Sequence, residues 1–276
     1  MNKLIINFAP TGMIPTKNMT PNVPISVSEI VEDIHKAYTL GITMVHLHAR
    51  DMQTGEPTYS SYVYSRIIEG IRKYAEDLII CVSTSGRTFK EYKKRIACLS
   101  LDNGLKPDMA SLTLSSLNFN KQASINEPDM IKKLAETMLY KGIKPELEAF
   151  DLGMINYAKY LSNKGLIKPP FYFNLILGNI ACAQANPLSL ALMINELPKK
   201  SVWSVGGIGN NQLIMNAASI VFGGGVRVGL EDNIWHDSDR TVLATNMSLL
   251  VRIHDIANSM GREIMKPNEA RSLLQL

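Results

Sequence analysis

Apolar, often β-branched runs alternate along the whole chain with segments of helical periodicity, and this alternation constrains the fold most. The runs that predict strands lie at residues 4–10, 44–50, 78–85, 108–114, 145–150, 171–177, 201–207 and 225–231. The helical segments lie at 26–41, 62–76, 88–101, 127–142, 154–165, 187–198, 211–224, 239–260 and 266–274. Such alternation with short connections predicts parallel strands joined by right-handed crossovers.

Two α/β architectures satisfy this pattern, an open doubly wound sheet and a closed barrel. Eight regular units within 276 residues, followed by a long helix at 239–260, favour the (β/α)8 TIM barrel. No repeat, linker or low-complexity segment divides the chain, so we expect one domain over residues 1–276. Residues 266–274 should form an additional C-terminal helix.

Composition and charge exclude several classes of protein. The formal net charge is +4 and the basic residues are scattered, which gives little support for nucleic-acid binding. No run of about 18 apolar residues occurs and the N-terminal apolar run is short, so we expect a cytoplasmic protein without a membrane segment. Three widely spaced cysteines, Cys81, Cys98 and Cys182, suit packed thiols in a reducing compartment.

Two histidines stand two positions apart in the strand predicted at 44–50. Because side chains alternate along a strand, His46 and His48 share one face, which in a barrel points into the lumen near its C-terminal mouth. Two imidazoles there can converge on one metal ion if a carboxylate from another strand completes the set. A pair of neutral, hydrogen-bonded histidines is the alternative, and the residues alone leave both open.

The last predicted strand ends in a dense group of charged residues. Arg227 and Glu231 lie in phase on one face if the strand stays regular, which makes Glu231 the natural third metal ligand. Asp232 beside Arg227 could act as a general base that the guanidinium holds in place. The alternative is a surface salt bridge at the end of a strand.

Polar side chains also gather near the ends of three other predicted strands. They are Ser83 and Thr84 in the third strand, Ser111 and Thr113 in the fourth, and Glu146 and Glu148 in the fifth. Small hydroxyls followed by a flexible turn could bind a carboxylate, although loop capping and filling of the lumen would also explain them. Two buried carboxylates on one face are rarely tolerated, so a ligand or a cation must compensate them.

Motifs along nearly the whole chain resemble those of the β-keto acid cleavage enzymes. In order, they are PNVPIS, VHLHAR, STSGR, KPDMASLTLSSLNF, KPELEAF, LILG, SVGGIG and RVGLEDN. HLHAR and RVGLEDN in this order are the specific ones, and they contain the histidines and the charged group described above. The family typified by 3-keto-5-aminohexanoate cleavage enzyme therefore supplies expectations for fold and chemistry.

The resemblance implies a (β/α)8 barrel with one zinc ion bound by His46, His48 and Glu231. It implies an acyltransferase that converts a β-keto acid and acetyl-CoA into acetoacetate and a new acyl-CoA, with Arg227 and Asp232 as the catalytic pair. The residues that we expect to bind substrate are Ser83, Thr84, Ser111, Thr113, Glu148 and Ile14. Relatives also suggest a homotetramer.

Two residues depart from the pattern of members that act on amino-keto acids. Ile14 stands where those members carry a carboxylate, and Thr113 stands where the type enzyme has an amide side chain. An apolar side chain cannot pair with a substrate ammonium group, so we expect a β-keto acid with an uncharged or apolar tail.

Two other functions are compatible with the same residues. A metal-dependent hydrolase would use an open site of two histidines and a glutamate to activate water. A non-catalytic barrel that binds a metabolite would retain the metal ligands without using them. The ligand set alone would also suit Fe(II) or Mn(II), and only the family likeness points to zinc.

Overall fold

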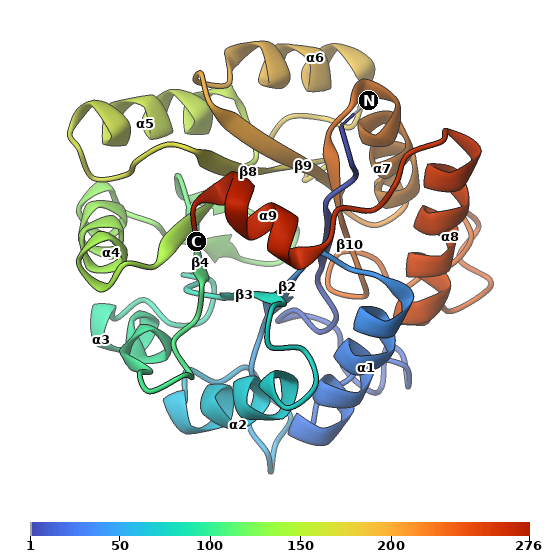
Figure 1. Cartoon of the computed structure of the whole chain (residues 1–276), viewed down its shortest axis with the longest axis horizontal. Coiled ribbons are helices and arrows are strands. Elements are labelled where there is room, and N and C mark those ends of the chain that lie inside the picture. Colours follow the sequence, from blue (N-terminus) through green and yellow to red (C-terminus); the bar gives the residue numbers. More distant parts are fainter. Residues whose placement is uncertain (1) are drawn as a thin grey trace.

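The computed structural model describes residues 2–276, and in them eight parallel strands close into one barrel in the order β1-β10-β9-β8-β7-β4-β3-β2 (Figure 1). The barrel strands are β1 (Ile6–Phe8), β2 (Met44–Leu47), β3 (Ile79–Val82), β4 (Met109–Thr113), β7 (Lys144–Ala149), β8 (Phe171–Leu177), β9 (Ser201–Gly207) and β10 (Gly225–Val228). Seven of them lie within the predicted runs, β7 begins one residue before its run, and the predicted TIM barrel is confirmed.

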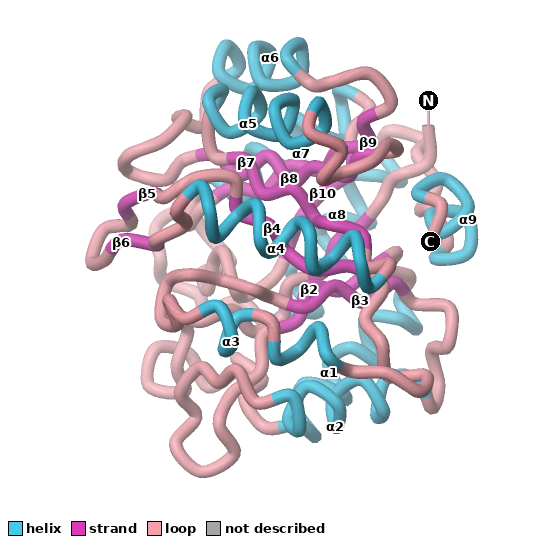
Figure 2. Tube along the Cα trace, turned by 90° about the vertical axis from the view of Figure 1, so that its left-hand side faces the viewer, coloured by secondary structure: helices cyan, strands magenta, loops and turns pink. Residues whose placement is uncertain are grey.

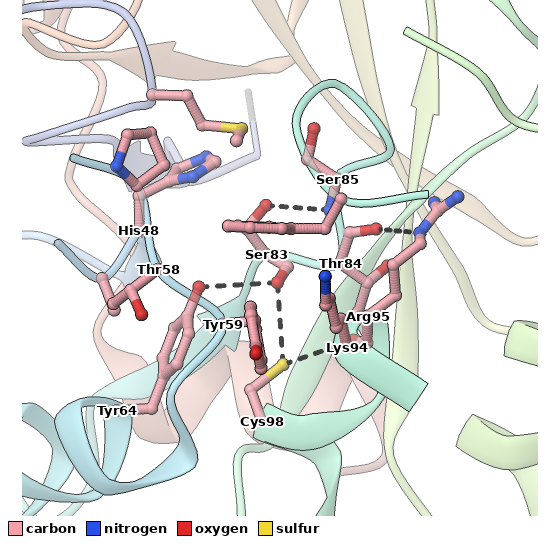
Figure 3. Close-up of a pocket in the computed structure, with 14 residues that line it drawn as sticks. His48, Thr58, Tyr59, Tyr64, Ser83, Thr84, Ser85, Lys94, Arg95 and Cys98 are labelled. Atoms are coloured by element: carbon pink, nitrogen blue, oxygen red, sulfur yellow. Dashed lines mark hydrogen bonds between the residues drawn. The ribbon is translucent and has the colours of Figure 1, made fainter. Parts of the chain in front are cut away.

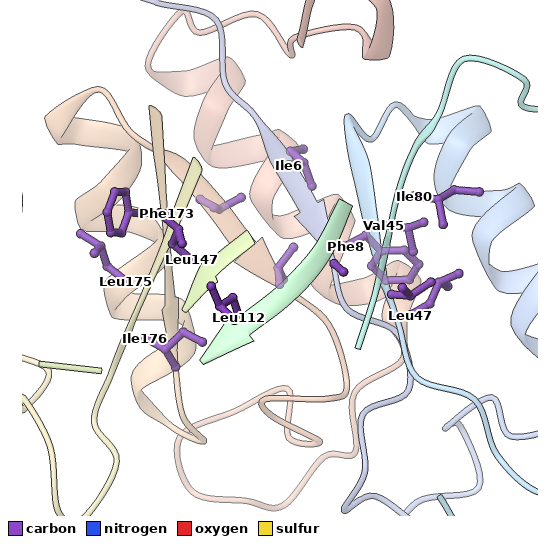
Figure 4. Close-up of a cluster of buried hydrophobic side chains, with 14 of the residues drawn as sticks. Ile6, Phe8, Val45, Leu47, Ile80, Leu112, Leu147, Phe173, Leu175 and Ile176 are labelled. Carbon is purple, nitrogen blue, oxygen red and sulfur yellow. The ribbon is translucent and has the colours of Figure 1, made fainter. Parts of the chain in front are cut away.

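Helices surround the barrel and cover the outward faces of the strands (Figure 1). They are α1 (Val27–Leu40), α2 (Ser61–Arg72), α3 (Tyr92–Arg95), the 3-10 helix η1 (Ala97–Ser100), α4 (Pro128–Lys141), α5 (Leu152–Asn163), α6 (Pro187–Glu196), α7 (Asn211–Phe222) and α8 (Asn246–Ser259). Side chains such as Val45, Leu47, Ile80 and Phe173 fill the layer between strands and helices (Figure 4). None of the helices in residues 2–276 is long and apolar enough to cross a membrane.

The helix predicted at 239–260 begins later than expected. Thr245 is the N-cap of α8, and its side chain accepts a hydrogen bond from the Ser248 amide. Before it, the Asp237 carboxylate accepts hydrogen bonds from the backbone of Thr241 and Val242 and closes a turn. The side chains of residues 237 and 245 therefore stabilise non-helical backbone.

Two further differences concern the loops after β3 and β4. The helix predicted at 88–101 is reduced to the short α3 and η1, and residues 88–91 are not helical. An antiparallel hairpin of β5 (Leu117–Asn118) and β6 (Ala123–Ser124), which was not predicted, follows β4.

The predicted additional helix is present as α9 (Pro267–Leu274), and it lies at the opposite end of the barrel from the β5–β6 hairpin (Figure 2). Ala270 and Leu274 pack against a buried cluster that includes Ile5 and Met44. Arg271 pairs with Asp108 at 2.9 Å. This helix thus covers the N-terminal end of the barrel and leaves the C-terminal ends of the strands for the site.

Candidate active site

A cavity of about 650 Å³ opens at the C-terminal ends of the strands. Of the predicted site residues, those on its wall are Ile14, His48, Ser83, Thr113, Glu148, Arg227, Glu231 and Asp232. They come from six different strands or the loops that follow them, which only closure of the barrel brings together. Active sites of this fold lie at this end of the barrel.

The three predicted metal ligands converge at the inner end of this cavity. His46 Nε2 lies 3.2 Å from His48 Nε2, which lies 3.1 Å from Glu231 Oε1. Two atoms that each bind a zinc ion at about 2.0–2.1 Å with tetrahedral geometry are about 3.4 Å apart, so the observed spacing fits one ion. The other oxygen, Glu231 Oε2, is buried and has no hydrogen-bond partner among residues 2–276. A cation would satisfy this atom.

The backbone opposite Glu231 leaves room for its side chain. Gly12, in the loop after β1, has a φ of +65°, and a Cβ added there would lie 2.6 Å from Glu231 Cγ. A larger residue would therefore be strained and would displace the carboxylate.

The second ring nitrogen of His46 contacts a carboxylate that sequence reasoning did not assign to the metal site. His46 Nδ1 lies 2.6 Å from Glu146 Oε2, and both side chains are fully buried. Burial disfavours charge on both groups, but their mutual attraction prevails, so that the pKa of His46 is raised to about 9 and the pKa of Glu146 is lowered to about 2. Glu146 thus holds the Nδ1 proton of His46 and directs Nε2 toward the candidate metal position.

Glu146 is itself fixed by amide and thiol donors. Asn7 and Asn174 donate hydrogen bonds to its Oε1 at 2.6 and 2.7 Å, and the Cys81 thiol lies 3.3 Å from Oε2. Because β1 and β7 stand on opposite sides of the eight-stranded ring, the bond from Asn7 crosses the lumen. The signal in the sequence was the face that Glu146 shares with Glu148. We expected a ligand or a cation to compensate these carboxylates, whereas Glu146 is compensated by His46 and by neutral donors of the protein itself.

Arg227 contacts three carboxylates. Its Nε donates to Asp232 Oδ2 at 2.8 Å, its Nη2 donates to Glu231 Oε1 at 2.6 Å, and its Nη1 lies 3.6 Å from Glu148 Oε1. Burial raises the pKa of Asp232 above its ordinary value, although Arg227 opposes the shift. Nη1 is buried without a hydrogen-bond partner among the described residues. The arrangement places a base of raised pKa and a free N–H donor on one cavity.

Thr84 and Ser111 do not line this cavity but join the ends of β3 and β4. The Thr84 amide donates to Ser111 Oγ at 3.1 Å, and the Thr84 hydroxyl donates to the Ser111 carbonyl at 2.6 Å. Thr113 lies on the wall, where its hydroxyl donates to Glu148 Oε2 at 2.6 Å. These hydroxyls therefore fix the strand ends and Glu148.

The turn after β3 is packed rather than flexible (Figure 3). The Thr84 carbonyl accepts a hydrogen bond from Arg95 Nε at 2.7 Å, and Ser83 Oγ accepts one from the Ser85 amide at 3.3 Å. A Cβ added to Gly86 would lie 2.2 Å from the Ile125 carbonyl oxygen, so only glycine fits there. The Ser83 hydroxyl is consequently held in place on the cavity wall.

A family model described as beta-keto acid cleavage enzyme matches residues 3–276. The chain belongs to this family. A 3-keto-5-aminohexanoate cleavage enzyme of Fusobacterium nucleatum is 38% identical over 278 residues, which cover 100% of this chain and 99% of the relative. A second one, of Acetoanaerobium sticklandii, is 36% identical over 275 residues, covering 99% and 98%. A 3-oxoadipate:acetyl-CoA acetyltransferase of Cupriavidus necator is 38% identical over 276 residues, covering 99% and 94%.

Solved structures agree on the fold of this β-keto acid cleavage enzyme. The apo structure of ObcA superimposes with a TM-score of 0.81 at 20% sequence identity. The match covers 93% of this chain and 66% of that one. The predicted family is thus confirmed, the chain is an enzyme, and a non-catalytic barrel is excluded by family membership.

Proposed function

We propose that this β-keto acid cleavage enzyme transfers an acyl group between a β-keto acid and acetyl-CoA. The products are acetoacetate and the CoA thioester of the acyl group that the β-keto acid carried. The relative from Cupriavidus necator is a 3-oxoadipate:acetyl-CoA acetyltransferase, which supports acetyl-CoA as the co-substrate. The observation that carries the proposal is the convergence of His46, His48 and Glu231 beside the cavity that Arg227 and Asp232 line.

The ligand set fits one zinc ion held by His46, His48 and Glu231. Such an ion, when bound, acts as a Lewis acid that polarises the keto oxygen of the substrate. The unpaired Glu231 Oε2 and the bond of His46 Nδ1 to Glu146 support this assignment, because both leave lone pairs for a cation.

Asp232 is the proposed base. It would remove a proton from the carbon between the ketone and the carboxylate, while Arg227 holds the aspartate in position. The raised pKa of Asp232 strengthens it as a proton acceptor. The carbanion then attacks the carbonyl carbon of acetyl-CoA, and the C–S bond breaks to release the CoA thiolate. The thiolate attacks the original acyl carbonyl, the carbon–carbon bond to that acyl group breaks, and the acetoacetate carbanion takes back the proton from Asp232.

The remaining predicted residues would bind and position the substrate. The Ser83 hydroxyl, held in its turn by Ser85, would donate to the substrate carboxylate. The hydrogen bond between Thr84 and Ser111 would fix the backbone of that turn. The Glu148 carboxylate would hold the Arg227 guanidinium in position. These roles divide the predicted substrate residues into direct contacts and supports.

We infer an uncharged or apolar tail on the β-keto acid. Ile14 is 47% exposed and lies on the cavity wall with Met13, Met19 and Trp235. This part of the wall has no carboxylate for a substrate ammonium group. A homotetrameric assembly stays a prediction from the family resemblance, and a cytoplasmic location stays a prediction from the apolar pattern of the sequence.

The test is a panel of β-keto acids with different tails, each incubated with zinc-loaded enzyme and acetyl-CoA. We expect acetoacetate and a new CoA thioester in equal amounts, with apolar tails preferred. Loss of the β-keto acid without any CoA thioester product would instead indicate a metal-dependent hydrolase and would overturn the proposal.

A further inference from the structure

We propose that Arg87 is the cation that binds the carboxylate of the β-keto acid, and that Phe119 is the platform that holds its guanidinium ready. This inference rests on the proposed function, because it names a residue that recognises the group common to all substrates of that reaction. It adds a charged partner to the hydroxyl of Ser83.

The first support is the position of the guanidinium. Arg87 lies on the wall of the same cavity as His48, Ser83 and Asp232. Its Cζ stands 3.4 Å from the centroid of the Phe119 ring, which is stacking distance. This ring meets Phe150 edge-to-face, at a centroid distance of 5.9 Å. A guanidinium stacked in this way keeps the N–H groups of its edge available for a planar anion.

The second support is the lack of a protein partner. Each of the other charged side chains that are largely buried on this wall, Arg227, Glu148, Glu231 and Asp232, has an oppositely charged neighbour among them. The Arg87 side chain has no ion pair and no side-chain hydrogen bond among residues 2–276. Burial lowers the pKa of Arg87, while the charges of Glu231, Glu148 and Asp232 oppose that shift. Arg87 is therefore a half-buried cation without an ion pair, and binding an anion would compensate its charge.

The third support is the turn that carries Arg87. The Arg87 amide donates to Ser85 Oγ at 3.3 Å, and the Ser85 amide donates to Ser83 Oγ at 3.3 Å. Arg87 is therefore anchored to the same packed turn as the hydroxyl that is proposed to contact the carboxylate. Both side chains line the same cavity, so the guanidinium and the hydroxyl are available as two donors for one carboxylate.

The phosphates of CoA are the competing anions for this residue. Lys121 and Arg240 lie on the same cavity wall but are exposed. Cations at an exposed rim suit the phosphates of a long co-substrate, whereas the half-buried Arg87 suits the small substrate. We therefore assign Arg87 to the keto acid.

The experiment measures binding of acetoacetate to zinc-loaded enzyme without acetyl-CoA, in the wild type and in Arg87→Gln. We expect the Kd of acetoacetate to rise about 10- to 100-fold, the usual loss for a charge-assisted hydrogen bond. Methyl acetoacetate, which has the ketone but no charge, should bind both proteins equally. In turnover, the KM for the β-keto acid should rise while the KM for acetyl-CoA stays within about 2-fold.

Matched variants separate this role from a general effect of charge or folding. Arg240→Gln removes the same charge from the same wall and should leave the Kd of acetoacetate unchanged. Phe119→Leu keeps Arg87 but removes the stacking ring, and should weaken acetoacetate binding by a smaller factor. Unchanged acetoacetate affinity in Arg87→Gln, an equal loss in Arg240→Gln, or a rise confined to the KM for acetyl-CoA would each overturn the proposal.

Binding and turnover also separate this inference from the proposed function. If no β-keto acid is converted but acetoacetate binds in an Arg87-dependent way, the carboxylate site stands and the transferase proposal fails. If transfer proceeds and acetoacetate binding ignores Arg87, the transferase proposal stands and this inference fails.

Discussion

Glu146 is a buried carboxylate that contacts a candidate metal ligand. Its Oε2 lies 2.6 Å from His46 Nδ1, and its Oε1 accepts hydrogen bonds from Asn7 and Asn174. Carboxylates in this position fix the tautomer and the orientation of a ligating histidine. Glu146 is therefore expected to act on metal affinity without contacting the metal.

We predict that Glu146→Gln lowers zinc affinity by about 10- to 100-fold, because a neutral amide holds the Nδ1 proton less strongly. Competition with a chromophoric chelator measures this directly. Cys81→Ala is the control, since it removes only the thiol contact of 3.3 Å to the same carboxylate and leaves the bond to His46. Equal zinc affinity of Glu146→Gln and the wild type would contradict the prediction.

Ile14 offers a test of substrate preference. We predict that Ile14→Glu gains activity on amino-keto acids, because a carboxylate at this exposed position of the wall can pair with a substrate ammonium group. The measurement is kcat/KM for 5-amino-3-oxohexanoate compared with a β-keto acid of apolar tail. Efficient turnover of 5-amino-3-oxohexanoate by the unmodified enzyme would refute the assignment of an uncharged tail.

Sequence reasoning reached the residues that the cavity brings together, and it did so for a physical reason. His46 and His48 occupy lumen-facing positions near the end of β2, which the two-residue period of a strand reveals. Glu231 was placed on the same face as Arg227 on the condition that the strand stays regular, but β10 ends at Val228 and Glu231 lies in the turn that follows. The bond between His46 and Glu146 joins residues 100 positions apart across the barrel, and no local pattern encodes it. The same holds for Thr84 and Ser111, whose mutual hydrogen bonds keep them off the cavity wall.

Among the elements, α1 shows how a helix terminus couples stability to pH. The Glu29 carboxylate accepts hydrogen bonds from the amides of Ser26 and Ile25 at 2.9 and 3.0 Å and from Lys17 Nζ at 2.6 Å. Burial raises the pKa of Glu29, but the Lys17 and backbone hydrogen bonds outweigh it and lower the pKa from 4.5 to about 2. A depressed pKa in the folded state means that the stabilisation is present above pH 4.5 and is lost as the pH falls toward 2.

We predict that Glu29→Gln lowers Tm at neutral pH by about 1–3 °C and flattens the loss of stability on acidification. The effect is small because the Glu29 side chain is 42% exposed. Thermal unfolding followed by circular dichroism at several pH values measures both quantities. Glu32→Gln on the same helix, which removes only an exposed pair with Lys36, should change Tm less; the reverse order would contradict the role of the cap.

The errors in the predicted elements share a cause. Helical periodicity at 88–101 and 239–245 describes spacing of apolar residues, but local hydrogen bonds decide where a helix starts. Asp237 closes a turn and Thr245 caps α8, so the backbone before residue 246 follows the mouth of the barrel instead. The β5–β6 hairpin is too short for alternation to be recognised.

At the scale of the whole molecule, the candidate metal site lies where the barrel closes. Its ligands come from β2 and from the end of β10, and both strands pair with β1. Parallel order and barrel closure followed from the number and spacing of the predicted strands. The same closure places β1, only three residues long, between the two strands that carry the candidate ligands.

We predict that removal of metal by a chelator lowers Tm by several degrees and that zinc restores it. Each tenfold excess of zinc above its Kd adds about 1.4 kcal/mol to the free energy of unfolding, because only the folded barrel assembles the ligands. Differential scanning fluorimetry over a zinc titration measures the shift. Gly12→Ala, which crowds Glu231, should abolish the gain, and a zinc-independent Tm of the wild type would contradict the site.

Asn7 and Asn174 form a buried layer of hydrogen bonds with Glu146, and this layer limits where the enzyme can be changed. Both amides donate to the Glu146 carboxylate, so a substitution in that layer removes a donor from a buried carboxylate and disturbs the residue that holds His46. The exposed Ile14 side chain makes no such hydrogen bonds, although the backbone of Gly12 and Pro15 on either side of it accepts hydrogen bonds from the buried Arg50. New specificities should therefore be sought by randomising the rim, with the inner residues kept constant.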